Sequence, residues 1–258
     1  MIKKYLILNL FLISLIFPLK PLFAYYKQAI TISPLTFEFS VSPGEEVSDE
    51  LKIYNSSEEI LKIVIDAQDF FPVGELGSVK IVEPEEENIF SIASWVKIEP
   101  KEFELEPRKE QPINFKINVP LNAEPGGKYV ALVASVVGKI TPEGTVSAVL
   151  QKAASLVLLS VKGEVKEKLK VIEFKGPKFQ EYGPVDFVLR LENEGNVHLR
   201  PRGFITITSW RGKKIVDLPI PQLSIIPQAK RVYTVKWNKK NIIGYFQATL
   251  VGNYGRNN

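Results

Sequence analysis

The chain has 258 residues, of which 45% are hydrophobic, so it has enough apolar side chains to build one or two packed cores. It contains no cysteine, which excludes disulfides, thiolate metal sites and a lipid-anchored N-terminal cysteine. The net charge of +4 is unevenly divided: residues 1–24 hold three lysines, residues 25–162 hold 13 Lys/Arg and 21 Asp/Glu, and residues 163–258 hold 17 and 8. This split predicts an interaction role for one half, attraction between the halves, or simple drift in surface composition.

The first 24 residues have the features of a secretory signal peptide. Two lysines precede an almost wholly apolar run at residues 5–17, and Ala24 offers a small residue at a plausible cleavage point. An uncleaved signal anchor is the alternative, but Pro18 and Lys20 interrupt the run before the ~20 apolar residues that a span needs. We therefore expect an exported protein of the cell envelope, cell surface or medium. Contact with a membrane is expected only through an uncleaved signal segment.

Residues 25–163 are predicted to form a first domain. Apolar and polar residues alternate in short stretches separated by turn residues, which is typical of half-buried strands. Pro34 interrupts the first stretch, so this strand should lie at a sheet edge or switch sheets. No segment combines a 3.6-residue apolar period with helix caps, so little helix is expected. The further predicted strands span residues 47–54, 61–67, 94–99, 102–105, 112–119, 128–137 and 146–161.

Residues 69–92 are predicted to be an insertion of surface loops. Gly127 follows Asn55 by 72 positions in the first half, whereas Gly244 follows Asn193 by 51 positions in the second. The extra length holds a segment with two glycines and an acidic run at 83–87, and function often collects in such loops. Calcium binding by the acidic residues of this region stays open, although no EF-hand spacing is present. The residues concerned are Asp66, Asp69, Glu83, Glu85, Glu86 and Glu87.

Both halves of the chain share one pattern of residues. The first copy reads Leu51-x-Ile53-x-Asn55, Leu105-Glu-Pro107, Ile113-x-Phe115-Lys-Ile117 and Gly127-x-Tyr129-x-Ala131-x-Val133, and the second reads Leu189-x-Leu191-x-Asn193, Ile225-Ile-Pro227, Tyr233-x-Val235-Lys-Trp237 and Gly244-x-Phe246-x-Ala248-x-Leu250. The repeat predicts an all-β protein in which two tandem immunoglobulin-like β-sandwich domains, residues 25–163 and 164–258, follow the signal peptide. The asparagine of the first copy should close its own turn. Tyr233, Val235 and Trp237 share one strand face, which we expect to be core.

The same residues carry a resemblance to a known family. Its marks are Ile32-Ser-Pro-Leu-Thr-Phe-Glu-Phe39, Pro43-Gly-Glu, Leu51-Lys-Ile-Tyr-Asn55, Leu105-Glu-Pro107, Val119-Pro120, Pro125-Gly126, Leu191-Glu-Asn-Glu-Gly-Asn196 and Pro201-Arg-Gly-Phe-Ile-Thr206. Across most of residues 29–254 the chain resembles the WxL-interacting surface proteins of Gram-positive bacteria. The resemblance implies a first domain associated with peptidoglycan and a second associated with host or partner proteins. The membrane-spanning helix and basic tail that usually end those proteins have no counterpart here, and no ligand residue matches the family's pattern.

Catalytic chemistry finds little support in the sequence. His198 is the only histidine, and no Gly-x-Ser-x-Gly or phosphate-binding Gly-x-x-x-x-Gly-Lys motif is present. Two carboxylates could converge for glycoside cleavage, but nothing distinguishes a pair. We expect a non-enzymatic protein without a cofactor or a metal, and we keep a secreted hydrolase as a distant third class.

A group of basic and aromatic residues in the second half is the candidate binding site. Guanidinium groups suit phosphate and carboxylate, and an exposed tryptophan can stack on a sugar. The alternative is a solvated positive face that docks on the acidic first domain. Nucleic acid fits the charge but not the expected location. The candidate residues are Arg200, Arg202, Trp210, Arg211, Lys213 and Lys214.

Two functional hypotheses follow. The first is an envelope protein that binds a cell-wall polymer or another surface protein in adhesion or as a scaffold. The alternative is a pilus-type assembly chaperone that completes a partner's fold by strand addition. The strand at residues 146–161 is apolar enough to be donated in that mode, which also needs a basic pair in the interdomain cleft to hold a carboxylate.

Overall fold

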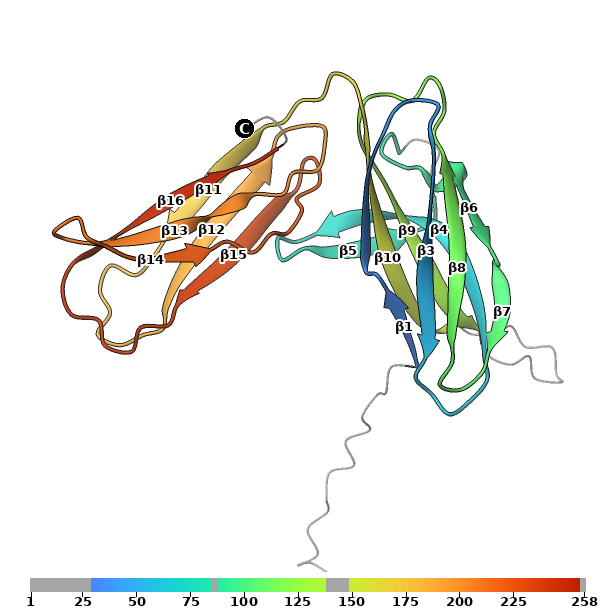
Figure 1. Cartoon of the computed structure of the whole chain (residues 1–258), viewed down its shortest axis with the longest axis horizontal. Helices are drawn as coiled ribbons and strands as arrows, with labels where there is room; N and C mark the ends of the chain where they lie inside the picture. The colour runs from blue at the N-terminus through green and yellow to red at the C-terminus, as the bar shows by residue number, and fades with distance from the viewer. Residues whose placement is uncertain (1–28, 85–87, 138–148, 256–258) are drawn as a thin grey trace, which may run out of the picture.

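The computed structural model describes residues 29–84, 88–137 and 149–255, which form two pairs of β-sheets (Figure 1). The predicted signal peptide and glutamates 85–87 lie outside these ranges. Apart from one three-residue 3-10 helix, η1 (Ala93–Trp95), the regular structure of the described part is strand, as the alternation predicted. No helix in that part is long and apolar enough to cross a membrane.

The first two sheets are built from the strands that precede residue 162. One sheet has the order β1-β3-β8-β6, and the other has the order β2-β10-β9-β4-β5, with β7 also paired to β4. The strands are β1 (Ile30–Ser33), β2 (Thr36–Val41), β3 (Glu46–Asn55), β4 (Leu61–Val73), β5 (Ser78–Val82), β6 (Val96–Glu99), β7 (Glu102–Leu105), β8 (Glu110–Asn118), β9 (Gly126–Val137) and β10 (Val149–Val161).

The proline between β1 and β2 marks a change of sheet. β1 pairs with β3 in the first sheet, and after Pro34 the chain continues as β2, which runs parallel to β10 in the second sheet. This confirms the prediction from the interrupted alternation. Phe37, Phe115 and Ile53 meet between the two sheets, where the inward-facing residues of both sheets form one buried core.

Part of the predicted loop insertion is in fact a β-hairpin. β4 continues to Val73 and pairs with β5 in antiparallel register, from Asp69 opposite Val82 to Val73 opposite Ser78. Gly74 and Gly77 form the turn with φ values of +65° and +86°, which glycine adopts without steric cost. The two glycines therefore close a hairpin that extends the second sheet, so the prediction of surface loops is wrong for this part of the insertion.

The strands after residue 168 form the third and fourth sheets, each with three strands in the orders β11-β12-β15 and β14-β13-β16. Tyr233, Val235 and Trp237 are buried along one face of β15, as predicted. The strands are β11 (Leu169–Lys175), β12 (Val185–Asn193), β13 (Arg202–Ser209), β14 (Lys214–Pro219), β15 (Lys230–Trp237) and β16 (Phe246–Asn253). Both halves of the chain are thus immunoglobulin-like sandwiches, in which all described strand pairs are antiparallel except β2–β10.

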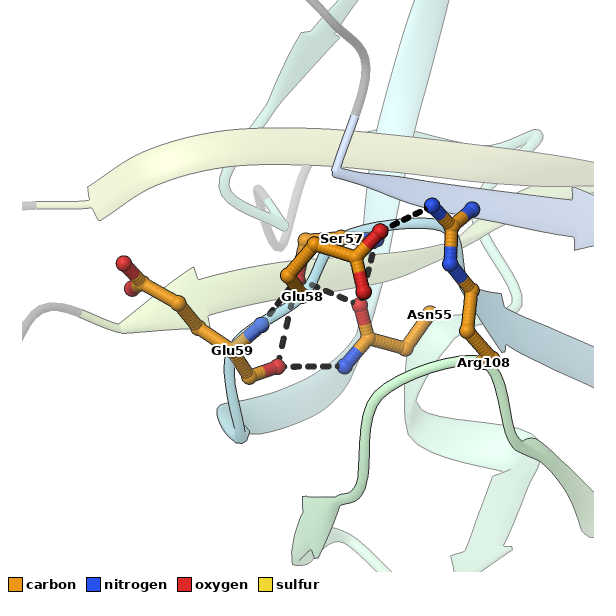
Figure 2. Close-up of polar contacts among 5 residues, drawn as sticks. All are labelled: Asn55, Ser57, Glu58, Glu59 and Arg108. Carbon is orange, nitrogen blue, oxygen red and sulfur yellow. Dashed lines mark hydrogen bonds and ion pairs between the residues drawn. The ribbon is translucent and has the colours of Figure 1, made fainter.

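The repeated asparagine has the same role in both sandwiches. Asn55 is fully buried at the end of β3, and its Nδ2 donates to the carbonyls of Glu59 (2.8 Å) and Leu105 (2.9 Å), while its Oδ1 accepts from the Ser57 amide (2.9 Å; Figure 2). Asn193 at the end of β12 donates to Val197 and Ile225 at 2.8 Å each. In each copy one asparagine therefore holds its own turn and a second segment far along the chain.

Candidate functional site

The most distinctive feature of the first domain is a part of the β10 edge that lies beside β1 but pairs with no strand among the described residues. β10 pairs with β9 along its length, but β2 covers its other side only from Leu156 to Val161. Among the described residues no strand pairs with 149–155 on that side. The Leu156 amide donates to the Leu35 carbonyl (3.0 Å), so the backbone amides of Ala154 and Lys152, two and four residues earlier, point toward the same side of the strand.

Side chains near this edge do not fill the backbone ladder. The Ala29 amide donates to the Gln151 side chain (2.7 Å), and the Ser155 hydroxyl donates to the Pro34 carbonyl (2.7 Å). Both contacts use side-chain atoms of β10. A row of unpaired backbone donors and acceptors is the template that another extended chain can pair with.

The face of the second sheet next to this edge is apolar. Phe70, Tyr129, Val133 and Leu158 are buried there and form one cluster, with Ala154 and Leu156 partly buried against it. Ile226 of the second domain packs on the same cluster. The apolar face of the first domain thus faces the cleft between the two domains.

A cavity of about 260 Å³ lies in that cleft, where the open edge ends. Thr36 and Leu156, the first residue pair of the β2–β10 ladder, both line it. Apolar side chains of both domains form part of the wall, and three cations of the second domain form another part. The lining includes Phe70, Leu158, Val79, Ile226, Arg200, Lys230 and Arg231.

The three cations of the cavity differ in how far they are already engaged. Arg200 pairs with Glu38 of β2, and its Nε donates to the Ser224 hydroxyl (3.3 Å). Arg231 donates through Nη1 to the Ser224 carbonyl (2.7 Å), whereas its buried Nε has no hydrogen-bond partner. Lys230 is held loosely, with its Nζ 3.7 Å from Glu192. Arg231 and Lys230 are therefore the cations with hydrogen-bonding capacity left for an anion.

Neighbouring contacts fix the loop that carries part of the cavity wall. The Tyr233 hydroxyl donates to the carbonyl of Leu223 (2.9 Å), a lining residue. Burial raises the pKa of Tyr233 to about 12, so the hydroxyl keeps its proton across the physiological range. The loop thus keeps its place beside Arg231.

The β4–β5 hairpin reaches the second domain and braces the cleft. Glu75 at its turn pairs with Arg190 of β12, and its backbone carbonyl accepts from the amide of Val232 on the edge strand β15 (2.8 Å). The hydrogen bond from Arg190 holds the pKa of Glu75 below its ordinary value of 4.5. A second connection joins the Gly127 amide to the Asn196 carbonyl (2.7 Å).

The residues of the predicted binding site do not form one site. Arg200 and Arg202 lie at the end of the second domain that faces the first, near Glu38 and His198. Trp210 to Lys214 form the β13–β14 turn at the opposite end. Lys214 pairs with Asp217, and Arg211 lies 4.6 Å over the Trp210 ring. The structure thus divides the six residues into an Arg200–Arg202 pair and a Trp210–Lys214 group.

The sole histidine and the acidic insertion have structural contacts. His198 packs edge-on against Tyr129 of the first domain, with 5.9 Å between the ring centroids. Glu83 accepts from the Gln68 amide (2.7 Å), and Asp69 accepts from Asn88 (2.8 Å) and from Ser91. Among the described residues no group of three acidic or histidine side chains is arranged to hold a metal.

Sequence reasoning missed Arg231, Lys230 and Glu75 as cleft residues. Lys230 is in step with the exposed residues of β15 and Arg231 with its core residues Tyr233, Val235 and Trp237, so the strand reads as an ordinary amphipathic strand with a cation at its start. Glu75 stands in the segment expected to be a loop. Their meeting depends on how the two sandwiches pack, and no local spacing in the sequence encodes it.

Comparisons with known proteins give likenesses of fold. No protein-family model and no curated protein matches the chain. The class 5 fimbriae chaperone CfaA aligns at 14% identity over 86% of this chain and 98% of its own, with a TM-score of 0.43. The YadV chaperone aligns at 14% identity over 89% and 100%, with a TM-score of 0.41. The CsuC–CsuE chaperone–tip adhesion subunit complex of Acinetobacter baumannii aligns at 9% identity over 87% and 98%, with a TM-score of 0.40. Likenesses this weak support no conclusion about function, and what the chain shares with these proteins is an arrangement of β-domains.

Proposed function

We propose that this chain is a non-enzymatic envelope protein that binds an extended segment of another envelope protein by strand addition. The open edge of β10 at residues 149–155 carries the proposal, because it offers backbone hydrogen bonds beside an apolar face. Assembly chaperones that act in this way are the class of function we assign. Chaperone is also the word in the names of the fimbrial neighbours, but the β10 edge is the ground for the assignment.

The apolar cluster beside the edge gives the added strand a place for its side chains. Successive side chains of a strand point to opposite faces, so alternate residues of the incoming segment would lie over Ala154 and Leu156. Backbone pairing supplies affinity, and this apolar surface selects segments with alternate apolar residues. A partner segment without alternate apolar residues would bury little apolar surface on binding and would therefore bind more weakly.

The cleft cavity gives the added segment an end point. The open edge ends at the Thr36–Leu156 pair, and the cavity begins there. Arg231 and Lys230 line it and can bind a carboxylate, either the partner's chain terminus or an acidic side chain. Strand addition of this kind needs a basic pair in the interdomain cleft, and we assign that role to Arg231 and Lys230.

Strand addition can be tested with a defined peptide. We expect an eight-residue peptide with alternate valines and a free C-terminal carboxylate to bind, and to slow hydrogen exchange at the Lys152 and Ala154 amides. Ala154→Pro removes one outward donor without touching the β9 ladder, so it should weaken binding about tenfold. Lys152→Ala is the matched control, because it keeps the backbone donor. Peptide binding that leaves both amides exchanging freely would reject the proposal.

The carboxylate contact needs a separate measurement. The same peptide with a C-terminal amide should bind the wild type about tenfold more weakly than the acid, and Arg231→Ala should abolish this difference. Lys236→Ala changes an exposed cation of the same strand outside the cavity and should preserve the difference. An acid preference that survives Arg231→Ala would remove the cavity from the binding mode while leaving the edge intact.

Binding of a cell-wall polymer stays a prediction of the sequence. The structure offers it a poorer site, because Arg200 already pairs with Glu38 and with Ser224. The group around Trp210 remains accessible and belongs to another surface of the molecule.

A further inference from the structure

The end of the second domain that faces away from the first is formed by three loops, residues 176–184, 210–213 and 238–245, and we call it the distal tip (Figure 1). Two register pairs, Val185 opposite Trp237 and Ser209 opposite Phe246, bring these loops to one end of the sandwich. The Trp210 amide donates to the Tyr245 carbonyl at 3.0 Å. The Ile242 amide donates to the Glu181 carbonyl at 3.2 Å, so the three loops are joined to each other.

The distal tip exposes several large apolar side chains. Five of them are each more than two-thirds accessible to solvent: Phe179, Tyr182, Trp210, Ile243 and Tyr245. Two of them, Phe179 and Tyr245, line a cavity of about 660 Å³ between the two sheets, whose wall also includes Phe187, Trp237 and Phe246. The apolar surface is therefore continuous with the open end of the core, and continuous patches of this kind mark interaction sites.

The charge of the distal tip is strongly positive. Its loops contain five cations, Lys178, Arg211, Lys213, Lys239 and Lys240, against the single acid Glu181. Two of the cations lie beside aromatic rings: Arg211 is 4.6 Å from the Trp210 centroid and Lys239 is 5.0 Å from the Phe246 centroid. Cations and apolar groups thus share one surface.

We propose that the distal tip docks on the surface of a lipid bilayer that contains anionic headgroups. Trp and Tyr favour the membrane–water interface because one part of each ring system is apolar and the other is polar. Lysine and arginine beside them are attracted to anionic headgroups. Ile243 favours a lipid surface over a polysaccharide. An aliphatic side chain does not stack on a sugar ring, but its burial at the boundary between headgroups and acyl chains lowers the free energy. This contact is separate from the β10 edge and from any signal anchor.

Vesicle sedimentation tests the proposal with the chain beginning at Tyr25, which keeps every described residue. We expect it to bind vesicles of phosphatidylcholine with phosphatidylglycerol and to stay in solution with phosphatidylcholine alone. Lys213→Ala with Lys240→Ala should weaken binding about fivefold for each charge removed. Ile243→Ser with Tyr245→Ser should weaken it at least about tenfold.

Matched variants in the first domain exclude a general effect of charge or hydrophobicity. Leu121→Ser changes an exposed aliphatic side chain, and Lys97→Ala with Lys101→Ala removes two exposed cations. These controls should bind as the wild type does. Binding that the tip variants leave unchanged, or that the controls lose equally, would overturn the proposal. Thermal unfolding of each variant verifies that the fold is retained.

Tryptophan fluorescence separates insertion from simple adsorption. Trp210 is exposed whereas Trp237 is buried, so anionic vesicles should shift the emission to shorter wavelength, and Trp210→Phe should remove that shift. A soluble polyanion, dextran sulfate, should produce no shift. Equal affinity for dextran sulfate and for the vesicles would make the tip a general polyanion site and would overturn the lipid assignment.

Discussion

Asn55 and Asn193 show how single residues organise each sandwich. Both are fully buried, and each stands at the end of an interior strand of its sheet, β3 in the first sandwich and β12 in the second. The residues that follow the prolines of the repeat, Arg108 and Gln228, both have left-handed φ values, 60° and 63°. The Arg108 amide donates to the Asn55 carbonyl (3.0 Å), and the Gln228 amide donates to the Asn193 carbonyl (2.9 Å). Each asparagine therefore ties two turns together through both its side chain and its backbone.

Replacement of either asparagine by alanine should cost about 3 kcal/mol of unfolding free energy, because buried carbonyls lose their donor and water does not reach them. Chemical denaturation measures this loss. Asn122→Ala is the control, since Asn122 is exposed and its change should stay within about 0.5 kcal/mol. Equal stability of Asn55→Ala and Asn122→Ala would show that the buried contacts of Asn55 contribute nothing net.

The sequence could foresee only part of this arrangement. An asparagine followed by serines predicts a closed local turn, and the Ser57 contact confirms it. The contact with Leu105 crosses 50 residues of chain. Its presence follows from the packing of the β7–β8 connection against the end of β3, which no local rule describes.

At the scale of elements, the β4–β5 hairpin differs most from the expectation. A segment with two glycines and a proline was expected to be a loop, yet Val79 and Ile81 alternate on β5 and pack against Phe70. The hairpin gains its stability from that packing, since a hairpin alone is marginal in water. The regular strands were easier to predict, because burial of one face imposes the two-residue period.

The two glycines of the hairpin turn give a matched pair of substitutions. A Cβ at Gly74 would meet nothing within 4 Å, whereas a Cβ at Gly77 would lie 2.2 Å from Nη2 of Arg231. Both alanine variants should lose about 1 kcal/mol of stability through backbone strain at positive φ. Only Gly77→Ala should also displace the guanidinium and reduce the preference for a free peptide carboxylate. Identical binding by the two variants would contradict the assigned position of Arg231.

At the scale of the molecule, the uneven charge of the sequence corresponds to contacts between the halves. The ion pairs Glu75–Arg190 and Glu38–Arg200 both join an acid of the first domain to a cation of the second. This supports the predicted attraction between the halves.

The six candidate binding residues are close in sequence and similar in charge, yet they do not form one site. β13 lies between Arg202 and Trp210, and the length of this extended strand places the two groups at opposite ends of the second domain.

The hairpin brace should weaken in acid. The pKa of Glu75 is lowered in the folded protein, so the stabilisation is present above the ordinary value of 4.5 and is lost as the pH falls through the lowered value. Small-angle scattering should then show a larger radius of gyration at a pH below the lowered pKa of Glu75 than at pH 7. Glu75→Gln should show a weaker brace at both pH values, while Glu99→Gln, at an exposed site, should behave as the wild type does. A radius that does not respond to Glu75→Gln would remove this ion pair from the brace.

The eight residues of β13 extend about 25 Å, and the cleft and the distal tip lie at its two ends. Occupancy of one end therefore leaves the other sterically free, and the two equilibria should be independent of each other. A molecule docked on a bilayer through the distal tip would hold the bound segment of its partner protein about one domain's length away from the headgroups.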